Sequence, residues 1–301
     1  MVRAAFIGLG LMGMPMARNL RRAVDTLIVH NRSAGRTAQL VAEGLTGAGS
    51  GAEAARLADL VFSCVPGPAD VRALYLRPGG VVEGLRTGQI VCEMSTIDPA
   101  THREVAAAVQ AQGAHYLDAP VSGGTSGARE GTLSIMIGGD AAALARIRPQ
   151  LQAMGKNIYH MGPVGAGAAT KLVNQMMGAI CALGVVEGLV LGVRAGLDPD
   201  QLYEVLSTSS GASRALTGHG PNILSRNFEP GFTIDLQYKD VSLAVQMARD
   251  LGVPTVAGGL AEQVIQTARA LRLGSRSNAA VVQPLERAVG FEVRSKRPNP
   301  R

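Results

Sequence analysis

Aromatic side chains are scarce in this chain: they make up 3% of its 301 residues, and tryptophan is absent. Cysteine is also rare, since Cys64, Cys92 and Cys181 lie far apart and form no C-x-x-C pair. An odd number of widely spaced cysteines argues against a disulfide framework and a zinc site, and it suits a reducing compartment. We therefore expect three buried thiols in a cytoplasmic protein.

Runs of lysine and arginine with aromatic residues between them are also missing, although the formal net charge is +6. This absence argues against nucleic acid as a partner, and the positive charge suits a small anionic ligand equally well. Part of the charge lies in EVRSKRPNPR, residues 292–301, which we expect to be a solvated basic tail. No cluster of His, Cys, Asp or Glu has the spacing of metal ligands, so we expect no metal site.

The most membrane-like stretch, residues 176–193, is long enough to span a bilayer. It contains Glu187 and many small residues, which favours a buried central helix and no membrane partner. With 47% hydrophobic and 17% charged residues, the chain can form a full core. Its length suits two domains or one large one.

Short apolar runs alternate with helical patterns over residues 1–163. RAAFIGLG, TLIVH, ADLVFSCVP and GQIVCEMST predict strands, and MGMPMARNLRRA and PATHREVAAAVQAQG predict helices between them. This alternation predicts an α/β domain with a doubly wound, mostly parallel sheet and helices on both faces. Over residues 164–291 only long apolar helical patterns follow, which predicts an all-helical second domain.

The first twenty residues, MVRAAFIGLGLMGMPMARNL, allow two interpretations. An early cation and an apolar run resemble a secretory signal, whereas G-x-G-x-x-G between a strand and a helix is typical of a dinucleotide-binding turn. The stretch lacks an A-x-A cleavage site and Pro15 breaks its apolar run, so we favour a Rossmann-type turn that binds a pyrophosphate at the helix N-terminus. The expected contacts are Gly8, Leu9, Gly10, Leu11, Met12 and Gly13.

The end of the second strand lacks the Asp or Glu that accepts the ribose hydroxyls in many NAD sites. The chain has Asn31, Arg32 and Ser33 there, with Arg36 close behind. An arginine attracts a 2′-phosphate and the polar neighbours can donate to it, whereas a carboxylate would repel it. This pattern predicts a preference for NADP(H) over NAD(H), unless Arg32 is only a solvated loop cation.

Six ordered stretches together resemble the β-hydroxyacid dehydrogenase family: FIGLGLMGMPMARNL, CVP, MSTIDP, DAPVSGGTSGAREGTLSIMIGG, GPVGAGAATKLVNQ and FTIDLQYKD. The family includes 3-hydroxyisobutyrate dehydrogenase, tartronate semialdehyde (2-hydroxy-3-oxopropionate) reductase and glyoxylate/succinic semialdehyde reductases, with 6-phosphogluconate dehydrogenase as a larger relative. The resemblance covers roughly residues 2–290. It implies hydride transfer between a nicotinamide cofactor and a short hydroxy acid or semialdehyde.

Lys171 lies at the start of the long helix, where the helix dipole and apolar neighbours both favour an uncharged amine. The resemblance implies that Lys171 is the general acid/base, and the alternative is a surface lysine at a helix start. Asn174 and Gln175 follow at spacings that share its helical face, and an amide there can orient the substrate hydroxyl. The Asn-Gln order resembles the tartronate semialdehyde reductases and leaves open which amide touches substrate. We favour Asn174.

The resemblance also implies a carboxylate site at Ser122, Gly123 and Gly124, where a hydroxyl and exposed N–H groups make a small anion nest. A purely structural turn would carry the same residues.

Five further residues complete the candidate site. Thr96 resembles a residue beside the nicotinamide and the substrate, and Val65 and Pro66 resemble the turn that lines the cofactor. Lys239 resembles a lysine that reaches the cofactor or substrate across the domain cleft. Phe232 is either a substrate neighbour or part of the core.

We therefore expect an NADP(H)-dependent oxidoreductase that interconverts a short 3-hydroxy acid and its semialdehyde. We also expect a homodimer or homotetramer that buries the apolar face of residues 171–195. The substrate stays open among tartronate semialdehyde, glyoxylate, succinic semialdehyde, 3-hydroxyisobutyrate and threonate-like acids. Weaker alternatives are oxidative decarboxylation of a sugar acid, imine reduction, and a catalytically silent cofactor-binding module. The short helical domain argues against the first of these, and Lys171 argues against the other two.

Overall fold

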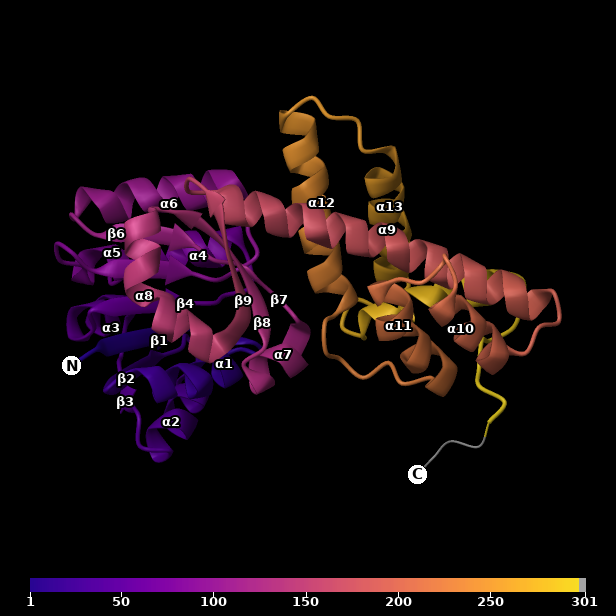
Figure 1. The fold of residues 1–301 in the computed structure, drawn as a ribbon, viewed down its shortest axis with the longest axis horizontal. Coiled ribbons are helices and arrows are strands. Elements are labelled where there is room, and N and C mark those ends of the chain that lie inside the picture. Colours follow the sequence, from indigo (N-terminus) through magenta and orange to yellow (C-terminus); the bar gives the residue numbers. More distant parts are fainter. Residues whose placement is uncertain (298–301) are drawn as a thin grey trace. The chain divides into compact units, whose positions relative to one another are not determined.

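The computed structural model describes residues 1–297, and the chain divides into two compact units (Figure 1). The first unit runs from Met1 to Lys171, and the second begins at Leu172. The sequence predicts a domain boundary at residue 163/164, whereas the division between units falls within the long helix. The first turns of that helix belong to the first unit because they contact its sheet, as described below.

The first unit contains a mostly parallel sheet, which confirms the predicted fold class. Its strand order is β3-β2-β1-β4-β5-β6-β8-β7, with β9 beside β8. Strands β1 to β6 are parallel, β8 is antiparallel to β6 and β7, and β9 is parallel to β8. The strands are β1 (Arg3–Ile7), β2 (Thr26–His30), β3 (Thr46–Gly47), β4 (Leu60–Ser63), β5 (Ile90–Glu93), β6 (His115–Asp118), β7 (Val121–Ser122), β8 (Leu133–Gly139) and β9 (Gly155–Gly162).

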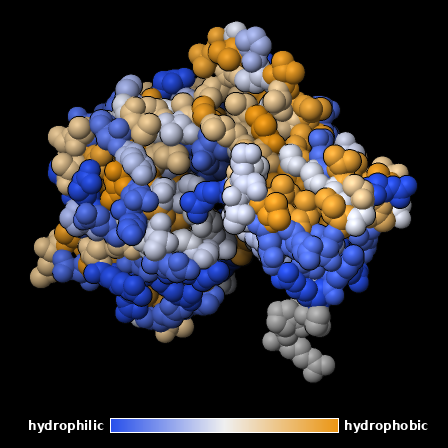
Figure 2. Space-filling model, turned by 45° about the vertical axis from the view of Figure 1, so that its right-hand side comes forward, coloured by the Kyte–Doolittle hydropathy of each residue, from blue (hydrophilic) through white to orange (hydrophobic). Residues whose placement is uncertain are grey.

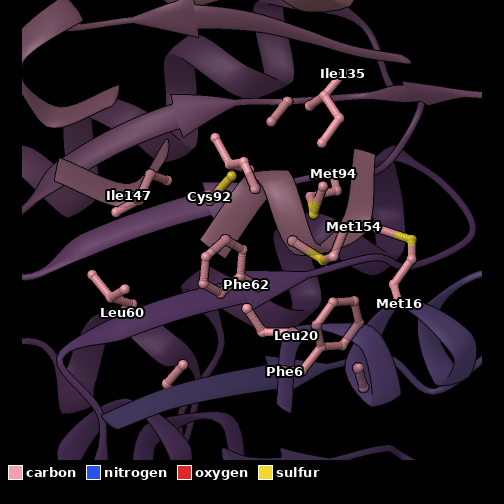
Figure 3. Close-up of a cluster of buried hydrophobic side chains, with 14 of the residues drawn as sticks. Phe6, Met16, Leu20, Leu60, Phe62, Cys92, Met94, Ile135, Ile147 and Met154 are labelled. Atoms are coloured by element: carbon pink, nitrogen blue, oxygen red, sulfur yellow. The ribbon is translucent and has the colours of Figure 1, made fainter. Parts of the chain in front are cut away.

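Helices cover both faces of this sheet, because alternate residues of each strand point to opposite sides. In β1, Phe6 joins a core under α1 and α8, whereas Ile7 joins a second core under α3, α4 and α6. Figure 3 shows the first core, in which Phe6, Phe62 and Met154 converge. The helices are α1 (Gly13–Leu20), α2 (Ala34–Ala42), α3 (Gly51–Leu57), α4 (Pro68–Leu76), α5 (Val81–Gly84), α6 (Pro99–Ala111), α7 (Gly124–Glu130) and α8 (Ala141–Met154), with a short 3₁₀ helix at Arg21–Ala23.

The second unit is helical throughout the part that the structure describes, apart from one isolated bridge between Thr233 and Ser277. Cys181 is exposed on α9, so the expectation of a buried thiol is wrong there. The helices are α9 (Ala166–Arg194), which begins in the first unit, α10 (Pro199–Thr208), α11 (Arg214–Ser225), α12 (Ile234–Asp250), α13 (Val256–Ala270) and α14 (Gln283–Val289), with a 3₁₀ helix at Asn278–Val282.

Helix α9 is long and apolar enough to cross a membrane by length and composition. The core helix of a soluble protein passes the same test, so this is weak evidence for a span. Only 44% of its most apolar window is buried within the chain. Much of this apolar helix therefore stays on the surface.

The basic C-terminal segment is attached to the helical unit over residues 292–297. Val293 is fully buried, and Asp200 accepts hydrogen bonds from the Ser295 hydroxyl at 2.7 Å and the Lys296 N–H at 2.9 Å. These contacts differ from the solvated tail that the sequence predicts for 292–301, and residues 298–301 lie outside the described residues.

The glycine turn depends on close backbone contact between β1 and α1. A Cβ on Gly13 would lie 1.8 Å from the carbonyl oxygen of Gly8, whereas a Cβ on Gly10 would meet only Arg36, at 3.8 Å. Gly8 has a φ of +93°, a conformation that favours glycine.

We expect Gly13→Ala to lower the free energy of unfolding by about 3 kcal/mol, because helix and strand must separate to admit the methyl group. Gly10→Ala is the matched control and should change it by less than about 0.5 kcal/mol. Urea denaturation of both variants measures the difference, and equal stabilities would contradict the packing argument.

Glu93 is a fully buried carboxyl group at the end of β5. It accepts hydrogen bonds from the Ser63 hydroxyl and from the Ser95 N–H, the latter at 2.7 Å. Burial raises the pKa of Glu93 above its ordinary value, although these hydrogen bonds act in the opposite direction. The folded state therefore keeps this proton to a higher pH than the unfolded chain does.

Glu93→Gln should remove that linkage while keeping a group able to donate to Ser63 and accept from Ser95. We expect the stability of the wild type relative to the variant to fall as pH rises from about 4.3, the ordinary glutamate value. The fall should end at the raised pKa and not exceed about 1.4 kcal/mol per pH unit. Urea titrations at several pH values give this difference, and a flat or rising difference would refute the assignment.

Candidate active site

Four strand ends place the candidate cofactor residues along one edge of the sheet. In the parallel register, Ile7 pairs with His30 and with Ser63, and Ser63 pairs with Glu93. The glycine turn therefore begins beside the segments that follow β2, β4 and β5. This is the carboxyl edge at which doubly wound sheets bind nucleotides, next to the point where the strand order reverses.

The glycine turn is held from both sides by side chains that follow β2. Asn31 Oδ1 accepts the Leu9 N–H at 2.9 Å, and Arg36 donates to the Leu9 carbonyl at 2.7 Å. The space beside Gly10 is open, as the absence of close neighbours for a Cβ shows. The backbone there is accessible to a pyrophosphate at the start of α1, so the turn fits a dinucleotide.

The three residues predicted to bind a 2′-phosphate behave differently from one another. Asn31 Nδ2 donates to the Ser33 hydroxyl at 2.7 Å, so its amide binds the glycine turn with one end and Ser33 with the other. Arg32 extends into solvent, with its side chain 90% exposed, and contacts Asp70 at 3.2 Å. Arg32 therefore presents its charge to solvent, while Asn31 fixes the turn.

The buried Glu93 also positions the segments after β4 and β5. Its carboxylate binds the Ser95 N–H, and the Ser95 hydroxyl accepts the Val65 N–H at 2.7 Å. Val65 and half-buried Thr96 therefore lie at fixed places on this edge, and Pro66 is exposed beside them. Glu93 and Ser95 are not among the residues predicted from the sequence, where the available signal was an acidic residue at the end of an apolar strand.

Asp118, at the end of β6, holds the start of α9. Its two oxygens accept the N–H groups of Gly165 at 2.7 Å and Ala168 at 2.8 Å. The helix lies so close to the sheet that a Cβ on Gly167 would come within 2.3 Å of the Met136 carbonyl oxygen. Burial raises the pKa of the Asp118 carboxyl, and the backbone hydrogen bonds from Gly165 and Ala168 counteract this effect.

Lys171 lies one helical turn after this anchor, and only 6% of its surface is exposed. The resemblance implied a role for Lys171, but nothing in the local sequence showed that Asp118 fixes its position. A buried lysine at an anchored helix start is unlike the surface lysine that was the alternative, because lysines are rarely fully buried.

The Ser122–Gly124 loop also starts from the end of β6. Gly123 and Gly124 have φ values of +133° and +64°, which glycine adopts without strain. Both glycines are exposed, and Ser122 is half-buried. The loop therefore presents backbone N–H groups and a hydroxyl at the start of α7, a favourable arrangement for a carboxylate.

In the second unit a buried carboxylate connects three of the predicted residues. Asp240, 2% exposed, accepts the Gln175 amide at 2.6 Å and pairs with Lys239 at 2.9 Å. Asn174 is exposed and donates to the Gln175 carbonyl at 3.1 Å. Phe232 is 37% exposed and precedes α12, so it is only partly covered by this unit's core. Within the residues described, no group of His, Cys, Asp and Glu could hold a metal ion.

Two family models match the chain. The model for the NAD binding domain of 6-phosphogluconate dehydrogenase matches residues 3–162, and that for the NAD-binding of NADP-dependent 3-hydroxyisobutyrate dehydrogenase matches residues 165–285. The chain is 41% identical to the NAD-dependent L-serine dehydrogenase of Pseudomonas aeruginosa, over 87% of this chain and 90% of the relative. It is 36% identical to the 2-hydroxy-3-oxopropionate reductase of Escherichia coli, over 95% and 97%.

A solved structure of 3-hydroxyisobutyrate dehydrogenase from Mycobacterium tuberculosis with L-serine is also similar. It has a TM-score of 0.86 and 32% identity, over 95% of this chain and 99% of that chain. These matches span both units and agree with the glycine turn, the sheet order and the helical second unit. The chain therefore belongs to the β-hydroxyacid dehydrogenase family and is an oxidoreductase that uses a nicotinamide cofactor and a small hydroxy acid substrate.

Proposed function

We propose that this enzyme interconverts a short 3-hydroxy acid and its semialdehyde with NADP(H), and that Lys171 is the general acid/base. The observation that supports this most strongly is the buried Lys171 on a helix start that Asp118 ties to β6. The same strand end leads into Ser122–Gly124, so the proton donor and the carboxylate site share one anchor. Relatives named 2-hydroxy-3-oxopropionate reductase and 3-hydroxyisobutyrate dehydrogenase act on molecules of this class.

In this mechanism the bound cofactor supplies or accepts the hydride at the reacting carbon. The Lys171 Nζ gives a proton to the carbonyl oxygen during reduction and takes it from the hydroxyl during oxidation. The Ser122 hydroxyl and the N–H groups of Gly123 and Gly124 bind the substrate carboxylate. The cofactor would lie against Leu9 to Met12, Ser33, Val65, Pro66 and Thr96, and Lys239 would be a further contact.

Asn174 is the better candidate for the amide that orients the substrate hydroxyl. The Gln175 amide nitrogen already donates to the buried Asp240, at 2.6 Å. Asn174 is exposed, and its amide nitrogen donates to the side-chain carbonyl of Gln175. Gln175 would then hold Asn174 in place, and Phe232 would contact the substrate only if the substrate reaches the start of α12.

Two other functions compete with this proposal. Glyoxylate or succinic semialdehyde reduction needs the same residues, so only a substrate panel separates it from tartronate semialdehyde reduction. A catalytically silent cofactor-binding module would need neither a buried lysine at the start of α9 nor a carboxylate nest at Ser122–Gly124. A solved imine reductase from Pseudomonas sp. shares the fold, with 20% identity and a TM-score of 0.60, and a likeness at this identity shows the fold alone.

We also propose that the chain forms a homodimer or homotetramer in the cytoplasm. Helix α9 exposes Val173, Met177 and Leu191, with exposed fractions of 44%, 59% and 71%. Figure 2 shows broad apolar patches on the surface of the helical unit. A second copy of the same helix would bury such a face, since large exposed apolar patches mark interaction sites.

Lys171→Met should abolish turnover, because it removes the proton donor. Methionine is chosen because its unbranched side chain has a length similar to that of lysine. We expect kcat to fall by at least about 100-fold, with the NADPH Kd within about twofold of wild type. The assay follows NADPH absorbance in both directions. Reduction is measured with tartronate semialdehyde, succinic semialdehyde and glyoxylate, and oxidation with 3-hydroxyisobutyrate and L-serine. Lys156→Met, at an exposed position of β9, is the control. If the Lys171 variant keeps most of the activity, Lys171 is not the general acid/base.

Arg32→Ala should raise the KM for NADPH by about tenfold and leave the KM for NADH nearly unchanged, because only NADPH carries the 2′-phosphate. Arg22→Ala, on the exposed 3₁₀ helix, serves as the control for loss of a surface cation. The measurement is the KM for NADPH and the KM for NADH of each variant, with the same substrate throughout. An equal effect on both cofactors would reject the preference for NADP(H).

A further inference from the structure

A carboxylate stands next to the cation that is proposed to bind the 2′-phosphate. Asp70 Oδ1 lies 3.2 Å from Arg32 Nη1, although the two residues are 38 positions apart in the chain. The Arg32 side chain is 90% exposed and that of Asp70 is 31% exposed. Both groups therefore face solvent at the same corner of the sheet, where a ligand can reach them.

The topology explains why Asp70 reaches this corner. Strand β1 lies between β2 and β4, so the segment after β4 returns to the sheet edge beside the segment after β2. Asp70 lies in the first turn of α4, which follows β4, and Arg32 follows β2 directly. A negative charge in a first helical turn also lies near the positive end of the helix dipole.

The second strand ends without an acidic residue. In many NAD sites a carboxylate at the end of that strand accepts the ribose hydroxyls, and it repels a 2′-phosphate. Here Asn31, Arg32 and Ser33 occupy that strand end, and Asp70 supplies a carboxylate from a different element. One corner of the site thus holds a cation suited to NADPH and an anion suited to NADH.

We propose that Asp70 is a specificity-determining residue that restrains the preference for NADPH and lets the enzyme use NADH as well. A 2′-phosphate that binds Arg32 must displace Asp70 or lie beside its negative charge. The ribose hydroxyls of NADH meet no such repulsion and find an acceptor. This inference rests on the proposed role of Arg32, and it assigns to Asp70 the balance between the two cofactors.

A second ion pair on the same helix provides a matched control. Arg72 contacts Glu104 at 2.7 Å, and both side chains are exposed, at 44% and 45%. Glu104 lies on α6, and its charge equals that of Asp70. Glu104→Gln therefore removes one exposed carboxylate from an ion pair, as Asp70→Asn does, without touching Arg32.

The test measures the Kd of NADPH and of NADH by cofactor fluorescence for the wild type, Asp70→Asn and Glu104→Gln. We expect Asp70→Asn to tighten NADPH binding by about fivefold, the scale of one charge acting through solvent on a dianionic phosphate. NADH binding should be unchanged or weaker, and Glu104→Gln should alter neither Kd. The gain for NADPH should shrink at high salt, because salt screens exposed charges.

Arg32→Ala separates failure of this inference from failure of the cofactor proposal. If Arg32→Ala leaves NADPH binding unchanged, the cofactor proposal fails and the inference fails with it. If Arg32→Ala weakens NADPH binding but Asp70→Asn leaves the ratio of the two Kd values as in the wild type, only the role of Asp70 is overturned. The role of Asp70 would also be overturned if Glu104→Gln shifted the ratio of the two Kd values as much as Asp70→Asn does.

Discussion

The carboxylate of Asp118 accepts the N–H groups of Gly165 and Ala168, and this contact ties the start of α9 to the end of β6. A helix is rigid over one turn, so the contact also sets the position of Lys171. Because the carboxylate is fully buried, both of its oxygens need partners. The first N–H groups of a helix provide them, since no carbonyl within the helix can.

Buried or half-buried polar side chains serve the backbone at each segment of the candidate site. Asn31 fixes the glycine turn, Glu93 fixes the segments after β4 and β5 through Ser95, and Asp118 fixes α9. Groups that face solvent include the exposed Gly123 and Gly124, the Arg32 guanidinium and the Asn174 amide. This division suits a site that binds a large anionic cofactor with prearranged backbone donors and few mobile side chains.

Local sequence pattern predicted the elements with strong periodicity and missed those without it. The strands β1, β2, β4 and β5 are apolar and buried, so their runs were visible. Strand β9 gave no such signal, because most of its residues are exposed at the sheet edge. The anchored part of the C-terminal segment was missed because a single buried Val293 does not stand out among charged neighbours.

The sequence by itself determined the α/β and helical halves, the glycine turn, and the set of residues that resembles the family, since periodicity and spacing are local properties. Only the tertiary structure decided which partners those residues have. Asp70 meets Arg32 across 38 positions, Asp118 meets Gly165 across 47, and Gln175 meets Asp240 across 65. Strand order and helix packing bring such pairs together, and a local sequence pattern cannot predict contacts between residues so far apart in the chain.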